Sequence, residues 1–104
     1  MGRKYDLECP IAATLNVVGE RWAIMILRDF FLHGTRRFQD LEQSLTGITP
    51  TVLSQRLKEL VAQQIVKCKL YSEHPPRYEY SLTPKGRELG PVILALKNWG
   101  KKHA

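Results

Sequence analysis

The chain has 104 residues, 43% of them hydrophobic and 25% charged, which is the size and composition of one soluble globular domain. No apolar run approaches the roughly 20 residues of a membrane span, and residues 1–6 lack the apolar segment of a signal peptide. We therefore expect a single domain over residues 1–104, located in the cytoplasm and without a membrane partner.

The formal net charge of +6 is confined to the second half of the chain. Residues 1–52 contain as many acidic as basic residues, so the whole excess lies from Leu53 onward. Segregated positive charge suits a polyanionic partner, and it favours nucleic acid.

The sequence has none of the common signatures of an enzyme or a metal site. Its two cysteines, Cys9 and Cys68, form no Cys-x-x-Cys pair, and its three histidines are scattered. It also lacks a glycine-rich phosphate-binding loop. We expect no catalysis, no cofactor and no metal, and we expect both cysteines to be thiols.

Two helices are predicted near the N-terminus. Cys9 and Pro10 begin the first helix, with proline at the first helical position, and Gly19 ends it in the manner of a C-terminal glycine. The second helix, about residues 20–32, is apolar over much of its circumference, which predicts a central and buried helix.

Residues 38–61 have the pattern of a helix-turn-helix. A short helix over residues 38–45 precedes a glycine-containing turn, and the second helix begins with Thr49 as its N-cap and Pro50 at its first position. Its apolar stripe consists of Leu53, Leu57 and Leu60. The opposite face is polar and predicts a recognition helix for the DNA major groove; it carries Thr51, Ser54, Gln55 and Lys58, with Arg56 at its flank.

A β-hairpin is predicted directly after the recognition helix. Residues 65–71 alternate between apolar and polar side chains, which indicates a half-buried strand with Cys68 on its inward face. Residues 72–77 contain two prolines and are predicted to form a turn that cannot continue the ladder, and residues 78–82 form the returning strand. A hairpin after a helix-turn-helix is the wing of a winged helix.

The last helix is predicted to begin at Thr83 and Pro84 and to run to about the C-terminus. Gly86 and Gly90 weaken its first turns, so a kink or a later start is an alternative. An apolar stripe on a terminal helix of a small domain needs a partner, either the first helix of its own chain or a second chain.

Six short motifs, in this order, resemble the HxlR-type winged-helix regulators: Cys9-Pro10-Ile11, Gly19-Glu20-Arg21-Trp22, Arg37-Phe38-Gln39-Asp40-Leu41, Leu53–Leu60, Pro75–Tyr80 and Leu82–Gly86. The resemblance covers about Cys9 to Trp99. It implies a bacterial transcription regulator, related in fold to the MarR-type proteins, that binds a pseudo-palindromic operator as a homodimer. We expect a repressor.

The fold class expected from the residues and the resemblance together is α+β and mainly helical. It is a winged helix-turn-helix with a two-stranded hairpin wing and with dimerisation helices at both ends of the chain. The side chains expected at the dimer interface are Ile11, Leu15, Leu89, Ile93, Leu96 and Trp99.

Individual roles on double-stranded DNA follow from side-chain chemistry. Gln55 is the first candidate for reading a base, since its amide can pair with adenine, and Arg56 is the candidate for guanine if its side chain swings inward. Lys58 is expected on a phosphate, where it positions the helix. Thr49, Thr51 and Ser54 of the same helix are expected to contact bases or phosphates. Arg36 and Arg37, just before the first helix of the motif, are expected on the DNA backbone. Arg77 of the wing is expected in the minor groove.

Cys9 is the candidate sensor residue. Its place at a helix N-cap favours a thiolate, and Arg3, Lys4 and Arg21 are nearby in the sequence. In several HxlR-type regulators a cysteine at this place responds to electrophiles or oxidants, and the resemblance carries that role to Cys9 alone. A small buried residue that merely caps the helix is the equally weighted alternative, whereas Cys68 is expected to be an inert buried thiol.

Two other functions stay open on the sequence alone. The chain could be a winged-helix protein-interaction module, or a regulator that responds to a small ligand and not to thiol modification. RNA binding is less favoured, because the hairpin shows no exposed aromatic platform in the sequence pattern.

Overall fold

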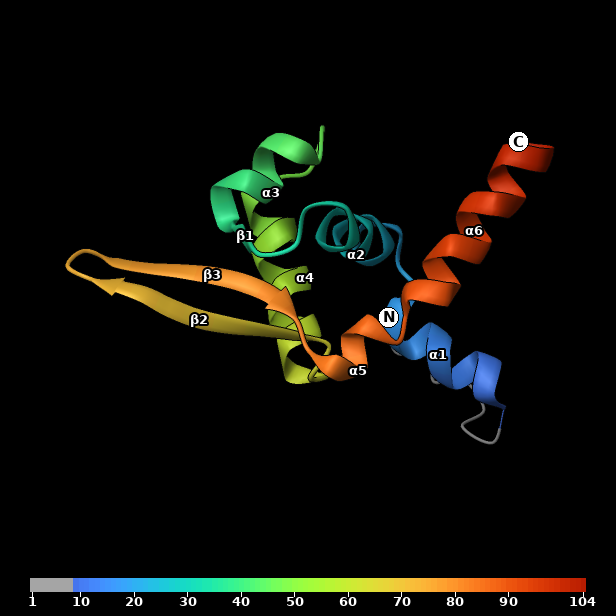
Figure 1. Ribbon diagram of the computed structural model, residues 1–104, viewed down its shortest axis with the longest axis horizontal. Helices are drawn as coiled ribbons and strands as arrows, with labels where there is room; N and C mark the ends of the chain where they lie inside the picture. The colour runs from blue at the N-terminus through green and yellow to red at the C-terminus, as the bar shows by residue number, and fades with distance from the viewer. Residues whose placement is uncertain (1–8) are drawn as a thin grey trace.

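The computed structural model describes residues 9–104, and it is built mainly of helices with a small antiparallel sheet at one side (Figure 1). In chain order the elements are α1 (Pro10–Val18), α2 (Arg21–His33), β1 (Arg36–Arg37), α3 (Phe38–Ser44), α4 (Pro50–Ala62), β2 (Val66–Glu73), β3 (Pro76–Leu82), α5 (Pro84–Arg87) and α6 (Gly90–His103).

The helices begin where the sequence predicts, because local side chains satisfy their free N–H groups. The Thr49 hydroxyl accepts from the Val52 N–H at 3.2 Å, and the Thr83 hydroxyl accepts from the Gly86 N–H at 2.9 Å. At α2 the Glu20 carboxylate accepts from the Ala23 N–H at 3.0 Å. These caps fix the first turns of α2, α4 and α5.

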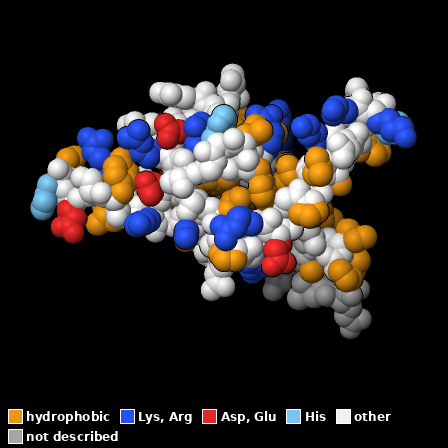
Figure 2. Space-filling model, in the orientation of Figure 1, with side chains coloured by type: hydrophobic (Ala, Val, Ile, Leu, Met, Phe, Trp, Pro, Cys, Tyr) orange, Lys and Arg blue, Asp and Glu red, His pale blue; other side chains and the backbone are white. Residues whose placement is uncertain are grey.

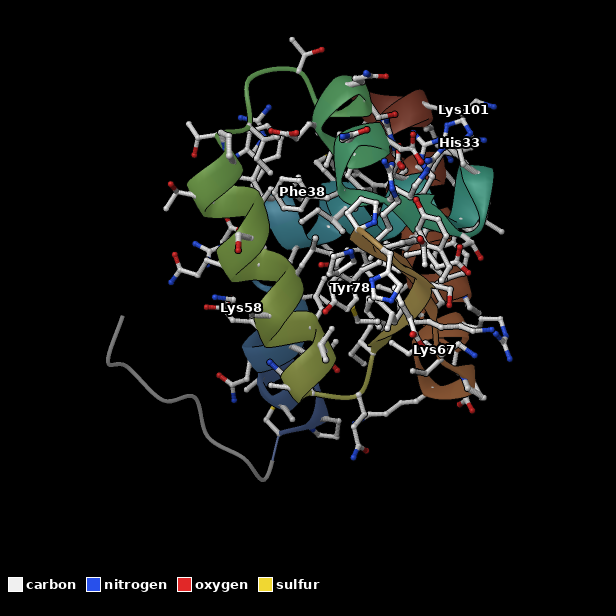
Figure 3. The ribbon with its side chains drawn as sticks, turned by 90° about the vertical axis from the view of Figure 1, so that its left-hand side faces the viewer. His33, Phe38, Lys58, Lys67, Tyr78 and Lys101 are labelled. Carbon is white, nitrogen blue, oxygen red and sulfur yellow. The ribbon has the colours of Figure 1, made fainter. Side chains whose placement is uncertain are left out.

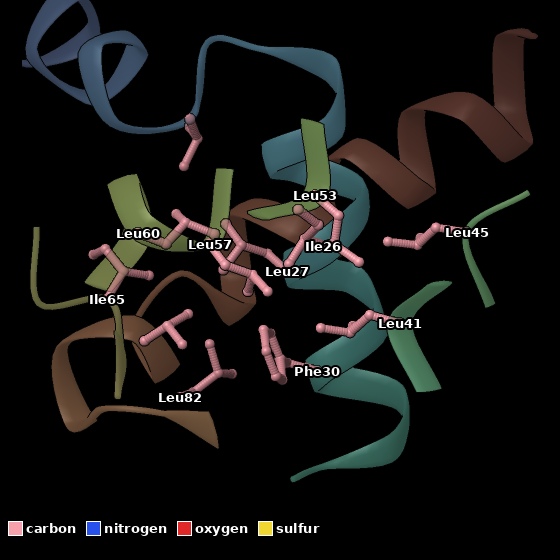
Figure 4. Packing of buried hydrophobic residues seen from close by; sticks show 12 residues of the cluster. Ile26, Leu27, Phe30, Leu41, Leu45, Leu53, Leu57, Leu60, Ile65 and Leu82 are labelled. Carbon is pink, nitrogen blue, oxygen red and sulfur yellow. The ribbon is translucent and has the colours of Figure 1, made fainter. Parts of the chain in front are cut away.

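The core lies where α2 crosses the helix-turn-helix, formed by α3 and α4 (Figure 4). The stripe predicted on α4 is confirmed, since Leu53, Leu57 and Leu60 are all 2% exposed or less. They meet Ile26, Leu27 and Phe30 of α2, Leu41 of α3, and Ile65, Val66 and Leu82 at the base of the sheet. Burial of a large aliphatic side chain stabilises a fold by about 1.5–3 kcal/mol, so this cluster is the main source of stability.

One face of α2 is exposed, although the helix is central and mostly apolar as predicted. Phe31 and Leu32 are exposed at 37% and 62%. The reason is geometric, because α3 and α4 cover only the side of α2 that carries Ile26, Leu27 and Phe30.

The sheet has three strands, in the order β1-β3-β2, and not the two that the sequence predicts. The extra strand is β1, in which Arg36 pairs with Tyr80 and Arg37 pairs with Glu79. A strand of two residues cannot show a period-two pattern, so no sequence signal marks it.

The wing formed by β2 and β3 is longer than predicted. The ladder continues through the segment expected to be a turn, with Ser72 opposite Arg77 and Glu73 opposite Pro76, so that only His74 and Pro75 connect the strands. Pro76 is tolerated because it stands at the first position of its strand, where no ladder hydrogen bond from its nitrogen is needed.

The C-terminal segment is two helices, which matches the alternative of a break near Gly90. The chain folds α5 over Pro84–Arg87 and starts α6 at Gly90. Gly86 is buried against the Ile65 carbonyl, where a Cβ would collide with the backbone. Gly19 also ends α1, but with φ −75° and not in the left-handed conformation of a C-terminal glycine.

Within residues 9–104 no single helix is long and apolar enough to cross a bilayer. Only α1 and α2 taken together reach that length and hydropathy, and they are bent by 81° at the break between them.

Candidate nucleic-acid interface

The polar face of α4 is open to solvent, as a recognition helix requires. Thr51, Gln55 and Lys58 are exposed and Ser54 is half-buried, whereas the leucines on the opposite side hold the helix against the core. Together with Phe38 and Pro50, these four polar side chains line a shallow depression, here called the helix hollow. The structure thus brings four of the predicted DNA-binding residues to one surface.

A second depression, here called the wing hollow, lies between the start of α3 and the wing. Its walls include Arg37, Phe38, Gln39, Tyr71, Arg77 and Tyr78. Phe38 lines both hollows, so the surface continues from the recognition helix to the wing. Figure 3 shows Phe38, Tyr78 and Lys58 on the face from which the wing projects.

Arg56 does not line the helix hollow in this structure, and its predicted role in reading guanine would require its side chain to swing inward and leave its present partners. Its Nε donates to Glu20 Oε1 at 2.9 Å, and its Nη1 donates to Glu59 Oε1 at 3.1 Å. The side chain is only 21% exposed. Arg56 therefore ties α4 to the start of α2, and it is not among the residues that line the helix hollow.

Arg36 is likewise engaged inside the chain, which does not favour its predicted contact with the DNA backbone. Its Nε donates to Asp29 Oδ2 at 2.9 Å, and its Nη2 donates to the Asp40 carbonyl and the Ser44 hydroxyl. Asp29 is completely buried in α2. An unpaired buried carboxylate is costly, so Arg36 compensates a charge in the core and joins α2 to α3.

Arg37, the next residue, points outward and keeps its predicted availability. Its Nη1 donates to the Tyr71 hydroxyl at 3.2 Å, and its guanidinium lies 5.9 Å from the centroid of the Tyr71 ring. Its Nε lies 3.8 Å from Asp40 Oδ2. The hydrogen bond with Tyr71 and the charges around it raise the pKa of Arg37 above its ordinary value.

The wing carries Arg77, Lys67 and Lys69, all exposed, on strands that project away from the body (Figures 1 and 2). Tyr71 and Tyr78 are exposed at 40% and 50%. Neither tyrosine is among the contacts predicted from the sequence, and the prediction that the hairpin has no exposed aromatic platform is wrong. The alternation places Tyr78 on the apolar side of its strand with Tyr80 and Leu82, and it does not say how far the wing extends beyond the core.

Cys68 is also exposed, against the prediction of a buried thiol. Only the Val66 end of β2 lies over the core, and the strand then leaves the body. Cys68 faces Tyr80 of β3 across the ladder. Burial, with a smaller effect of Cys68, raises the pKa of Tyr80 above its ordinary value.

Cys9 is half-buried at the N-cap of α1, with an extended backbone at φ −95°. Its thiol makes no capping hydrogen bond. Its carbonyl accepts from the Ala13 N–H at 2.9 Å, so Cys9 caps α1 through its backbone, and the alternative of a capping residue stays open beside the sensor role. Of the predicted cationic neighbours, Arg3 and Lys4 lie outside the described residues, and the Arg21 guanidinium lies 5.4 Å from the Trp22 ring centroid.

The predicted dimerisation residues fall into two groups. Ile11, Leu15, Leu96 and Trp99 are exposed by 43% to 73%, as unpartnered interface residues would be. Leu89 and Ile93, in contrast, are half-buried against the core of their own chain and hold α6 to α2. Leu94, which the sequence stripe missed, is 55% exposed on the same helix.

The described residues contain no group of three or more His, Cys, Asp or Glu side chains placed to hold a metal ion.

A helix-turn-helix with an open polar recognition helix and a basic wing defines the chain as a DNA-binding winged-helix protein. A family model described as HxlR-like helix-turn-helix matches residues 17–104, and the chain belongs to that family of transcription regulators.

Relatives of known sequence and structure agree with this assignment. The chain is 37% identical over 95 residues to YdeP of Bacillus subtilis, described as an uncharacterized HTH-type transcriptional regulator, covering 91% of this chain and 73% of YdeP. The structure of a transcriptional regulator assigned to the MarR family from Porphyromonas gingivalis W83 superposes with a TM-score of 0.86 at 31% identity, over 98% of this chain and 99% of that one. The redox regulator HypR in its oxidized form gives 0.84 at 36% identity, over 92% and 98%.

Proposed function

We propose that the protein is a homodimeric repressor that binds an inverted repeat in double-stranded DNA and releases it when Cys9 is oxidised. The observation that carries the proposal is the continuous surface made by the helix hollow and the wing hollow. It presents amide, hydroxyl and cationic groups from two elements that reach different grooves of a duplex.

On this surface Gln55 reads a base in the major groove, since it is the longest exposed amide on the open face of α4. Thr51 and Ser54 bond bases or phosphates beside it, and Lys58 binds a phosphate. Thr49 contacts DNA at the N-terminal end of α4, where its hydroxyl also accepts a hydrogen bond from the Val52 N–H. Arg77 enters the minor groove from the wing.

The homodimer rests on the uncovered apolar side chains of α1 and α6. α6 has no fully buried residue, although it is the longest helix, and hydrophobic side chains gather along α1 and α6 in Figure 2. Two copies that pair these faces would each present one recognition helix, which fits an inverted repeat.

The redox response rests on Cys9 and on the similarity to HypR, which has been solved in an oxidized and a reduced form. Cys9 is partly exposed, its thiol makes no capping hydrogen bond, and it stands at the N-cap of α1, one of the two helices of the proposed interface. Two Cys9 thiols, one from each subunit, would lose two protons and two electrons to an oxidant and form one disulfide, which changes how the subunits hold their recognition helices.

A regulator that responds to a small ligand is the second candidate. It is favoured by a cleft of about 650 Å³ between α1, α2 and α4, lined by Leu15, Ala23, Glu20, Arg56 and Glu59 among others. A ligand in this cleft would contact the ion pair that joins α4 to α2.

The deciding experiment is selection of bound sequences from random duplex DNA with the reduced protein and with the protein treated with diamide. We expect an inverted repeat from the reduced sample only. Cys9→Ser should bind in both samples, whereas the control Cys68→Ser, which removes the other exposed thiol, should behave like the wild type. The same repeat from both wild-type samples would discard thiol sensing and favour the small-ligand candidate. No enriched sequence would favour a protein-interaction module.

A further inference from the structure

The strand β2 contains an irregularity at one residue of the wing hollow. The pairing with β3 runs in regular steps from Val66 to Leu70, and it then shifts, so that Leu70 pairs with Tyr78 and Ser72 with Arg77. Tyr71 is the extra residue and has no partner in the ladder. A bulge of this kind re-aims the side chain that it carries.

The re-aimed side chain meets Arg37 from a different part of the chain. The Tyr71 hydroxyl accepts from Arg37 Nη1 at 3.2 Å, and the ring lies under the guanidinium at 5.9 Å. On the other side Asp40 accepts from the Arg37 backbone N–H at 2.9 Å and lies 3.8 Å from its Nε. Arg37 is thereby held both at its backbone N–H and at its guanidinium group.

The arginine is held but not neutralised. Among the described residues, the Arg37 guanidinium donates one Nη1 proton to Tyr71 and forms one long ion pair with Asp40, and it has five N–H donors in all. The Arg37 side chain remains 53% exposed, while Arg36 beside it is 19% exposed and fully engaged by Asp29, Asp40 and Ser44. Arg77 lines the same hollow and adds a second positive charge.

We propose that the wing hollow seats one backbone phosphate of the bound DNA, and that Tyr71 is the positioning residue that holds Arg37 toward it. The ligand is a phosphodiester, because the Arg37 guanidinium offers planar cationic donors and the tyrosine wall offers no base-specific pattern, while Arg77, which also lines the hollow, reaches into the minor groove. The hollow lies next to the helix hollow, so this phosphate is in the strand segment between the major-groove and minor-groove contacts. The inference rests on the proposed DNA binding and adds a site and a residue to it.

The test is a salt titration of binding to the selected operator and to an unrelated duplex, with wild type, Arg37→Gln, Tyr71→Phe and Tyr71→Leu. One lost phosphate contact lowers the slope of log affinity against log salt by about 0.9. Arg37→Gln should show that change and an affinity loss of about threefold to tenfold, equal on both duplexes. Tyr71→Leu should lose nearly as much, and Tyr71→Phe, which keeps the ring under the guanidinium, should lose less. Lys101→Gln, which removes one positive charge on α6, is the matched control and should leave the slope unchanged.

The double variant Tyr71→Leu with Arg37→Gln separates positioning from direct contact. If Tyr71 acts through Arg37, the double variant binds like Arg37→Gln alone. A further loss in the double variant would overturn the positioning role. A wild type that binds DNA while Arg37→Gln keeps the full salt slope would overturn the phosphate seat alone. A wild type with no salt-dependent DNA binding would overturn the proposed function and this inference with it. Thermal unfolding of each variant confirms that the comparison is made between folded proteins.

Discussion

The two ends of the molecule differ in how completely one chain buries its own apolar side chains. At the helix-turn-helix end, the stripe of α4 is 2% exposed or less. At the α1 and α6 end, Ile11, Leu96 and Trp99 are 73%, 52% and 64% exposed. We call the first the finished end, because its apolar side chains are buried, and the second the unfinished end, because apolar side chains of the described residues remain exposed there. Substitutions in the first should therefore change the stability of the chain itself, and substitutions in the second should change its assembly.

The largest effect on the finished end is expected from Arg36. Arg36→Gln leaves the buried carboxylate of Asp29 without its cation, which should lower the free energy of unfolding by about 3–5 kcal/mol. Urea unfolding measures this loss. The neighbouring Arg37→Gln is the matched control, and it should leave stability nearly unchanged because Arg37 points to solvent.

The comparison predicts that this loss is independent of protein concentration, since the Arg36 contacts lie inside one chain. The double variant Asp29→Asn with Arg36→Gln should recover part of the stability, because it removes the buried charge as well. An equal loss in Arg37→Gln would contradict the division of roles between the two arginines.

The next largest effect is expected at the unfinished end. Leu96→Asp, or Trp99→Asp, places a charge on the exposed face of α6 and should convert the protein into monomers. Operator affinity should then fall about 100-fold, since two linked recognition helices bind far better than one. Sedimentation measures the assembly, and titration of the operator measures the affinity.

Leu70→Asp is the control for assembly, because Leu70 is exposed at 42% on the wing, away from α6. It should keep the wild-type mass in sedimentation. If Leu96→Asp instead keeps the wild-type mass and lowers the free energy of unfolding, the apolar face of α6 belongs to the core of its own chain. The two ends would then not differ in the way proposed.

A smaller effect is expected on the recognition helix itself. Gln55→Ala should cost about 1–3 kcal/mol of binding free energy on the operator and should relax the preference at one base pair. Competition with operators altered one base at a time measures both quantities. Gln63→Ala, an amide at the end of the same helix and outside the helix hollow, is the control and should change neither. A uniform loss on all sequences would show that Gln55 only positions the helix.

The finished end is also the part that local sequence predicts best. The bounds of α4 follow from the Thr49 cap, Pro50 and the leucine spacing, all of which act within a few residues. Gly47 marks the turn before it, where the backbone has φ +93°. Each of these features is confirmed by the structure, because no distant contact is needed to decide them.

Features that depend on distant contacts were not predictable in the same way. Arg36 and Arg37 look alike in the sequence, and their different roles are decided by Asp29 in α2 and by Tyr71, which is 34 residues away. Similarly, alternation identified the side of β2 that carries Cys68, but it could not show that the core ends near Val66. Periodicity predicts on which face of a helix or strand a side chain lies, whereas tertiary packing decides which residues that side chain contacts.

The smallest effect is expected from the link between α2 and α4, the ion pair of Glu20 and Arg56. Both side chains are partly solvated, with 42% and 21% exposed, so solvent screens the pair, and Glu20→Gln should lower stability by less than about 1 kcal/mol. Glutamine still offers an oxygen to the Ala23 N–H, so the cap of α2 is kept. Base preference should stay unchanged in Glu20→Gln and in Arg56→Lys, since Arg56 lies outside the helix hollow. A changed preference at a guanine in either variant would mean that Arg56 leaves Glu20 on binding and reads the base. DNA binding would then rearrange side-chain contacts at the finished end.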